Sequence, residues 1–500
     1  MDGAYPELSD AGRRLFAPLE GRRATVAQLY QAAAELEQTY VKAGFMLARV
    51  AVPQQSLSDG GDFHVVVVDG FIEQVDVAKV PENVRAPVRD IVTRLVGVHK
   101  LETNLLQATL ARAGAVYGAQ LRSTLVQGET PGGARLVLDG GYSEFGVSLS
   151  ASNNLGPVFN DWGLNLSAQV NSPTGHGEQV YGFLSGGPRI DQYFGKEAVR
   201  WVGGGGVILP LTSWGLQVNP EFTISDTRPL TANPLLVSHD RLYRGSLNWI
   251  FPVPLGEPGA TTGKFTTELV DETTELPVFN FVLAHDRLTV LRGSLSWNGA
   301  WEAAQTGLHA EGTLSKGVPW LGARSAAGNV LDGSPLSRGS DPEFTKLEIT
   351  LGASQSLPYG ALLNLTGRAQ TSLGGLVPSS ETFDLTSQAA LSSYTQGAFS
   401  TDAGYTVRAQ LEYPFEPRFI GFRLGTTPYV FVANGGAWPV ADDDLTPTQI
   451  VDYGLGLRLD GTQLPWLGVA PSFALEYGHA QPNRGAASPD YVRFNIGLQL

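Results

Sequence analysis

The last ten residues, YVRFNIGLQL from Tyr491 to Leu500, constrain the fold of this chain more than any other stretch. Apolar and polar side chains alternate strictly along them, which is the pattern of a strand with one apolar face. The apolar face carries Val492, Phe494, Ile496, Leu498 and Leu500, and the polar face carries Arg493, Asn495, Gly497 and Gln499. A strand of this kind needs a partner along its edge. We therefore expect an earlier segment with a matching alternation to pair with it and close a barrel.

Composition narrows the class of protein. Of the 500 residues 42% are apolar and 16% charged, 60 are glycine and none is cysteine. A chain without cysteine is typical of an oxidising compartment, although cytosolic chains can lack it too. No apolar run approaches the roughly 18 residues that a membrane helix needs. The net charge of -14 argues against a nucleic-acid partner. Since MDGAYPELSD has neither a basic nor an apolar leader region, we expect that a secretory signal, if one existed, has been removed.

The first 140 residues predict two small α+β modules, residues 1–70 and 71–140. Apolar residues at helical spacing over 23–43 predict a helix that ends at Gly44. Two strands are expected after it, at 46–52 and 63–68. A similar order then repeats. A strand is expected at 71–77, helices at 84–96 and 101–113, and a closing pair of strands at 121–126 and 135–138. Each module has about 70 residues, which is near the lower end of domain size.

After residue 140 the helical period disappears and two-residue alternation takes over. The polar faces of these strands carry charged residues such as Arg408, Glu412 and Arg458, so both faces cannot be dry. Two segments repeat each other, HDRLYRGSLNW from His239 and HDRLTVLRGSLSW from His285, as expected of repeated hairpins. About 360 residues in strands of ~10 residues give roughly 16 antiparallel strands. The predicted fold is thus α+β modules followed by an all-β transmembrane barrel over residues 141–500, and a large soluble β protein is the alternative.

No catalytic, metal-binding or cofactor site is predicted. The stretch GEPGATTGKF lacks the spacing of a phosphate-binding loop. The pairs His239-Asp240 and His285-Asp286 could orient an imidazole as in a hydrolase, but no GxSxG motif accompanies them. We therefore expect a protein that is not an enzyme and has no cofactor.

Four segments carry a resemblance to a known family: GAYPEL, YVKAGFMLARVAVPQQ, FHVVVVDGFIEQV and SASNNLG. They are similar to the two-partner secretion transporters (TpsB) of the ShlB/FhaC/HecB haemolysin secretion and activation type. The resemblance implies two periplasmic POTRA modules, the first lacking its beginning, in front of a 16-stranded barrel in the outer membrane of a Gram-negative bacterium. It also implies a monomer whose partners are membrane lipid and one secreted client, a large β-helical exoprotein.

Client capture would then occur at exposed strand edges of the modules. An unfolded client has unpaired main-chain groups, and an edge strand can pair with them by β-augmentation. The candidate edges lie at 63–68 and 121–126, and their candidate client-binding residues are Phe63, Val65, Val67, Leu121, Ser123 and Leu125. The alternative for the run of valines is a strand buried on both faces.

The resemblance also implies a loop that folds into the barrel lumen. In the family a VRGY or VRGF tip presents an Arg to the Asp of an FxDxG segment on a later strand. The matching tip here is Leu391 to Tyr394, so the Arg has become Ser392, and FxDxG reads FVANG from Phe431, so the Asp has become Ala433. A second register through Gln396 also lacks an Arg. We expect the loop, near 391–404, to enter the lumen all the same and to be held by neutral contacts. The predicted latch comprises Ser392, Tyr394, Gln396, Gly397, Phe431, Ala433 and Asn434.

Three functions remain open at this stage. The first is an exoprotein transporter, which could also activate its client. The second is a factor that assembles other outer-membrane barrels, which usually has more POTRA modules. The third is a passive porin, for which the two N-terminal modules have no evident use.

Overall fold

The computed structural model describes residues 2–55, 62–195, 197–254, 259–325, 334–387, 389–419, 422–438, 448–462, 468–483 and 488–500. The chain divides into two compact units. The first comprises Met1–Glu144 with Asn171–Gln179, and the second comprises Phe145–Val170 with Val180–Leu500.

The first module has two helices over a small sheet. Its elements are η1 (Pro6–Leu8), α1 (Ser9–Phe16), η2 (Ala17–Leu19), α2 (Val26–Lys42), β1 (Arg49–Ala51) and β2 (Val66–Val68). Thr25 and Gln28 form a capping box at the start of α2, and Gly44 follows its end with φ of +93°. The core of the module is made by Tyr5, Leu36, Tyr40, Ala48, Val65 and Val67. The predicted helix over 23–43 is thus confirmed.

The second module has a three-stranded sheet of order β3-β5-β4. Its elements are β3 (Phe71–Lys79), α3 (Glu82–Val92), η3 (Thr93–Leu95), α4 (Thr103–Gly114), β4 (Ala119–Gln127) and β5 (Gly133–Tyr142). The strand β3 runs parallel to β5, and β4 runs antiparallel to it. The valines at 84, 88 and 92 place one apolar face of α3 on the sheet. None of the described helices is long and apolar enough to cross a membrane.

Asp69 joins the two modules through hydrogen bonds to both. Tyr5 Oη of the first module donates to its carboxylate at 2.5 Å, and the backbone N–H of Lys100 in the second module donates at 2.9 Å. The ring of His99 lies 2.8 Å from the other oxygen. Burial would raise the pKa of Asp69, but these hydrogen bonds outweigh burial and lower the pKa below its usual value.

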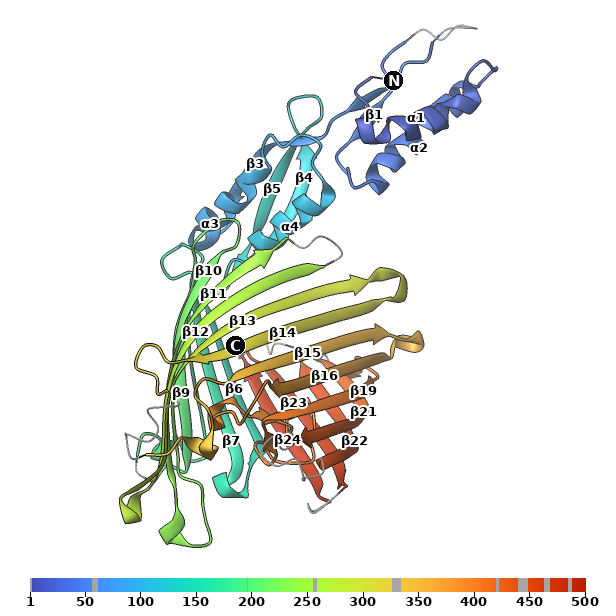
Figure 1. The fold of residues 1–500 in the computed structure, drawn as a ribbon. Coiled ribbons are helices and arrows are strands. Elements are labelled where there is room, and N and C mark those ends of the chain that lie inside the picture. The colour runs from blue at the N-terminus through green and yellow to red at the C-terminus, as the bar shows by residue number, and fades with distance from the viewer. Residues whose placement is uncertain are drawn as a thin grey trace. The chain divides into compact units, whose positions relative to one another are not determined.

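The second unit is a closed antiparallel barrel (Figure 1). Sixteen strands of eight to 21 residues form its wall, and the two-residue β20 (Arg418–Phe419) adds to β21. The first eight are β6 (Phe145–Gly156), β7 (Asp161–Asn171), β8 (Gln179–Gly186), β9 (Arg200–Pro210), β10 (Gln217–Thr227), β11 (His239–Val253), β12 (Ala260–Leu276) and β13 (Phe281–Trp301). The other eight are β14 (Thr306–Val318), β15 (Thr345–Ser356), β16 (Leu362–Ser372), β19 (Ala403–Glu412), β21 (Phe422–Trp438), β22 (Thr448–Gly461), β23 (Ala470–Pro482) and β24 (Asp490–Gln499).

The C-terminal strand behaves as its alternation predicts. It closes the barrel by pairing with β6 (Figure 1). In this pairing Leu498 lies opposite Leu149. Its apolar residues Val492, Ile496 and Leu498 are 42–48% exposed, whereas Arg493 is only 4% exposed. Apolar side chains therefore face outward and polar ones face the lumen, as in a barrel that crosses a membrane. The predicted fold class is confirmed.

The repeated HDRL segments lie on the two strands that flank β12. One begins β11 at His239 and the other lies in β13 at His285, and both strands pair with β12. Their RGSL portions place Arg244 and Arg292 on either side of Glu268 of β12, at 3.7 and 2.8 Å. The repeat thus builds an ionic row on the inner wall.

Candidate functional site

The connection between β16 and β19 folds into the barrel, and we call its residues 376–402 the inward loop. It contains η12 (Ser379–Glu381) and the short hairpin β17 (Phe383–Asp384) with β18 (Ser400–Thr401). Leu385 and Leu391 are almost fully buried and pack with Ala433, Ile450 and Ala480 of the wall. Burial of these leucines gives the loop a fixed position against β21, β22 and β23.

The tip of the inward loop is bound by charged residues of the wall. The backbone N–H of Ser393 donates to Asp452 of β22 at 2.9 Å, and its hydroxyl donates to the same carboxylate. Arg408 of β19 donates to Ser392 Oγ at 2.9 Å. Arg493 of β24 donates to the backbone carbonyls of Ser392 and Tyr394, at 2.8 and 3.0 Å. We call Ser392, Ser393, Arg408, Asp452 and Arg493 the wall latch.

The predicted neutral latch is therefore wrong. The tip of the loop contributes only hydroxyls and main chain, and the charges of Arg408, Asp452 and Arg493 come from the wall. Arg408, Ala433 and Asp452 are in register across β19, β21 and β22, so a cation and an anion flank Ala433 at one level. Glu476 also pairs with Arg408 at 2.7 Å. The missing family charges are thus replaced by charges on neighbouring strands, which a comparison limited to the two motifs could not reveal.

Small residues of the wall make room for the tip. A Cβ added at Gly478 of β23 would collide with the hydroxyl of Ser393, and one added at Gly435 would lie 2.8 Å from Leu391 Cδ1. These glycines therefore permit close approach of the loop to the wall.

Two further ionic contacts hold the arms of the inward loop. Glu381, 1% exposed, binds Arg292 of β13 at 2.6 Å and Lys346 of β15 at 3.0 Å. Asp402 binds Arg338 at 2.7 Å. The predicted latch included none of these residues, although the repeated RGSL segment contains Arg292. The loop is consequently held at both arms as well as at its tip.

The predicted latch residues divide into three groups. Ser392, Tyr394, Phe431 and Ala433 lie together, and the guanidinium of Arg408 stacks 3.7 Å from the Phe431 ring centroid. Gln396 and Gly397 lie beyond the tip, are exposed, and donate through their backbone N–H groups to Asn154 O and Asp384 Oδ2. The prediction that Asn434 belongs to the latch is wrong. It follows the inward-facing Ala433, so its side chain lies on the opposite face of β21 and bonds Tyr405.

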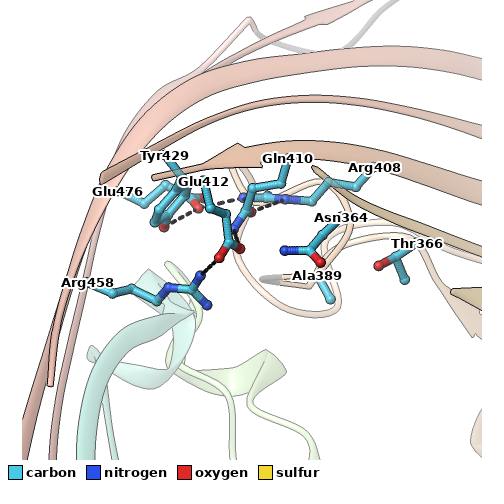
Figure 2. A pocket seen from close by; sticks show the side chains of 9 residues that line it. All are labelled: Asn364, Thr366, Ala389, Arg408, Gln410, Glu412, Tyr429, Arg458 and Glu476. Carbon is cyan, nitrogen blue, oxygen red and sulfur yellow. Dashed lines mark hydrogen bonds and ion pairs between the residues drawn. The ribbon is translucent and has the colours of Figure 1, made fainter. Parts of the chain in front are cut away.

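A polar pocket of about 430 Å³ opens beside the latch. Figure 2 shows Arg408, Gln410, Tyr429 and Glu476 joined in one network. A second ion pair there joins Arg458 to Glu412 at 2.6 Å. The remaining residues that line the pocket are Asn364, Thr366 and Ala389. Paired charges and amides therefore line this part of the lumen.

The strand edges of the two modules differ from the prediction in one case. The first candidate edge lies at β2, which contains Val67 and follows Phe63 and Val65. This strand pairs with β1 on one side and with Asp2 on the other. Val65 and Val67 are 2% and 4% exposed. The prediction of an open edge at 63–68 is therefore wrong. The sheet has two strands, β1 and β2, but Asp2 occupies the other side of β2, and Val65 and Val67 belong to the core. The buried alternative was correct for these two valines.

The second candidate edge has an open side. Among the described residues β4 pairs with β5 alone, so β4 is an edge strand. Leu121 and Leu125 are half-buried against the core of the module, and Ser123 between them is exposed. Whether these residues bind a client stays a prediction.

The His-Asp pairs of the repeat are not paired within themselves. His239 bonds Asp226 at 2.9 Å and Glu275 at 3.1 Å, and His285 bonds Asp271 at 3.1 Å. These contacts join neighbouring strands at the same end of the barrel as the inward loop.

Comparison with known proteins agrees with this architecture. The POTRA domain of the ShlB type matches residues 7–70, and the haemolysin secretion/activation protein family ShlB/FhaC/HecB matches residues 280–459. No curated protein has significant sequence similarity to the chain. Three solved structures are similar over 100% of this chain. CdiB from Escherichia coli is 16% identical, with 89% of its chain covered and a TM-score of 0.77. CdiB from Acinetobacter baumannii is 14% identical, with 88% covered and a TM-score of 0.67. BamA from Haemophilus ducreyi lacking POTRA domains 1-3 is 12% identical, with 98% covered and a TM-score of 0.52.

The POTRA match, the closed barrel of sixteen strands and the match of residues 280–459 to a secretion family together indicate an outer-membrane transporter. Residues 280–459 match the haemolysin secretion/activation family ShlB/FhaC/HecB, in agreement with the resemblance to the two-partner secretion transporters. The predicted resemblance and the outer-membrane location are confirmed.

Proposed function

We propose that the protein exports one large β-helical exoprotein, whose unfolded chain is first captured by the POTRA modules and then conducted through the barrel. Residues 1–70 and 71–140 act as two POTRA modules in the periplasm, and residues 141–500 form the conducting barrel. Capture occurs by β-augmentation at an edge strand, and no catalytic step is required.

One observation supports conduction above the others. Beyond the small apolar cluster of Leu385 and Leu391, the inward loop is held in the lumen by hydrogen bonds and ion pairs to the wall, including those of Ser393 to Asp452 and Glu381 to Arg292. Polar contacts of this kind can be exchanged for water when the loop moves, whereas a lumen packed with apolar side chains could not open at similar cost. The loop obstructs the resting channel and is displaced when a client enters.

The surroundings of the barrel follow from its exposed surface. Outward residues such as Val430, Val432 and Leu455 are more than half exposed and apolar, which suits contact with lipid. Closure of β24 on β6 leaves the wall without an open edge, so a single chain suffices for a complete barrel. We therefore propose a monomer in the lipid of the outer membrane.

Export by cells tests this function. The full chain and a variant without residues 1–140 are each co-expressed with a candidate β-helical exoprotein in a Gram-negative host, and both are reconstituted in planar bilayers. We expect both to conduct ions and only the full chain to export. Export by the shortened variant would contradict capture by the modules. Insertion of other barrels into the membrane, without export, would instead favour an assembly factor.

A further inference from the structure

Each of the two modules has an edge strand, and the two edges differ in whether a side chain already occupies their outward backbone N–H groups. This difference bears on where a client binds. In the first module the edge strand is β1, which has only three residues and pairs with β2 through Val50 opposite Val67. Backbone N–H groups of an edge strand point alternately toward its partner and away from it. Val67 directs its N–H away from β1, to the carbonyl of Asp2 at 2.9 Å, so the N–H of Val50 points outward as well.

This outward N–H is already occupied. Glu37 of α2 accepts a hydrogen bond from the Val50 N–H at 2.9 Å, and its other carboxylate oxygen lies 3.8 Å from the guanidinium of Arg49. A carboxylate on an edge amide takes the place that the carbonyl of an added strand would fill. Charged side chains at sheet edges commonly prevent strand addition in this way. Hydrogen bonds to a charged group are stronger than the neutral bonds that an incoming main chain offers.

The edge of the second module lacks such a guard. Its strand β4 has nine residues, three times the length of β1. In the described part of the chain, no side chain accepts a hydrogen bond from the backbone of 120–127, whose ladder is made with β5 alone. On the helix-facing side, half-buried Leu121 and Leu125 flank the exposed Ser123. An added strand would thus find both main-chain partners and apolar surface at alternate positions.

We propose that β4 is the strand-addition site of this transporter and that Glu37 keeps the edge of the first module closed. The partner is an extended, unfolded segment with apolar side chains at alternate positions. This inference rests on the proposed function and specifies which edge performs the capture.

The chain has no cysteine, which permits a direct test on the full-length protein. Single variants Arg122→Cys on β4 and Ala51→Cys on β1 are incubated with a ten-residue peptide of alternating Val and Thr that carries one activated disulfide. Gln120→Cys serves as a second site on β4, since Gln120 and Arg122 are both exposed. A peptide with N-methyl groups at alternate amides is the matched probe, because it keeps the side chains and removes the main-chain donors.

We expect capture at both β4 sites, at least tenfold weaker capture with the methylated peptide, and little capture at Ala51→Cys. Adding Glu37→Ala should raise capture at Ala51→Cys about tenfold, given the strength of one hydrogen bond to a charged group. Glu37→Gln retains an acceptor oxygen and should leave capture at Ala51→Cys low. Glu35→Ala, on the same helix but without contact to β1, should also leave it low.

Two results would overturn the inference while the proposed function stands: equal capture at Ala51→Cys and Arg122→Cys with Glu37 intact, or no gain from Glu37→Ala. Capture at neither module would instead contradict client binding by β-augmentation itself. Capture that N-methylation leaves unchanged would show that side chains alone are responsible. It would refute both the assignment of β4 and client binding by β-augmentation.

Discussion

Replacing Asp452 by Asn should loosen the tip of the inward loop. Asp452 is fully buried and accepts two hydrogen bonds from Ser393, one from the backbone and one from the hydroxyl. The amide oxygen of Asn can accept the bond from the Ser393 backbone N–H and its NH2 group can donate to the Ser393 hydroxyl, but the side chain has no negative charge. The change therefore removes charge assistance and leaves the shape of the site nearly intact.

The expected size follows from the two bonds. A hydrogen bond to a charged group contributes about 1.5–3 kcal/mol and a neutral one about 1 kcal/mol, so the loss of charge from two bonds costs the bound tip roughly 1–4 kcal/mol. Since about 1.4 kcal/mol is a factor of ten, the ratio of released to bound tip should rise by roughly 5-fold to several hundred-fold. Arg408 and Arg493 still hold Ser392, and Glu381 still holds one arm, so the loop should fluctuate more often without leaving the lumen for good.

Single-channel recording in planar bilayers measures this ratio as the fraction of time in the high-conductance state. Asp460→Asn is the matched control, because Asp460 lies on the same strand and, eight residues on, on the same face, but is exposed. We expect the open fraction to rise in Asp452→Asn and to stay at the wild-type level in Asp460→Asn. Equal behaviour of the two variants would refute the role of Asp452 in the latch.

Three other predictions concern the arms of the loop, the family charges and the module junction. Glu381→Ala leaves Arg292 and Lys346 without their anion and should weaken the anchoring of the inward loop by about 3–5 kcal/mol. Protease should then cut within 376–402 faster than in the wild type. The control Glu348→Ala should be cut at the wild-type rate. Ser392→Arg brings a second cation against Arg408 and should raise the noise of the channel current. Adding Ala433→Asp, in register with Arg408, should lower that noise again. Additive effects of the two changes would mean that the two positions do not interact. The pKa of Asp69 is lowered in the folded protein, so its ionised contacts stabilise the junction at neutral pH and are lost as pH falls below about 3.9 and through the folded value. Thermal unfolding followed by the helical circular dichroism signal should lose stability over that range in the wild type, and Asp69→Asn should remove this part of the pH dependence.

The barrel could be predicted because its physical basis is local. Alternation at Tyr491–Leu500 follows from one face in lipid and one in water, and each strand shows it independently of its neighbours. The same holds for the helix after Thr25, where a capping residue and helical spacing lie within one segment. Such features need no knowledge of which strands meet.

The latch could be predicted only in part because its contacts join distant segments. The entry of the loop was expected, and Ser392, Tyr394, Phe431 and Ala433 do lie together. The alternation predicts only that Arg408 lies on a polar face, and nothing in the sequence alone places it beside Ser392. Register across three strands, as between Arg408 and Asp452, is fixed by the whole sheet.

The edge at 63–68 failed for a related reason. A run of apolar residues is compatible with a central or an edge strand, and only pairing distinguishes the two. Bonds of Asp2 to Val65 and Val67 occupy the side that the prediction left open. For β4 the sequence alone suggested an edge, and the sheet order places β4 at one.

Locking the inward loop to the wall tests most directly whether the loop must move during export. Because the chain has no cysteine, Ser393→Cys and Gly478→Cys can be combined in it without other thiols. A side chain at 478 would meet that of 393, which is the proximity that a disulfide requires. Export of the exoprotein is then measured in oxidised and in reduced cells, with each single cysteine variant as control. We expect the oxidised double variant to export nothing and to recover on reduction, whereas equal export in both states would contradict the account.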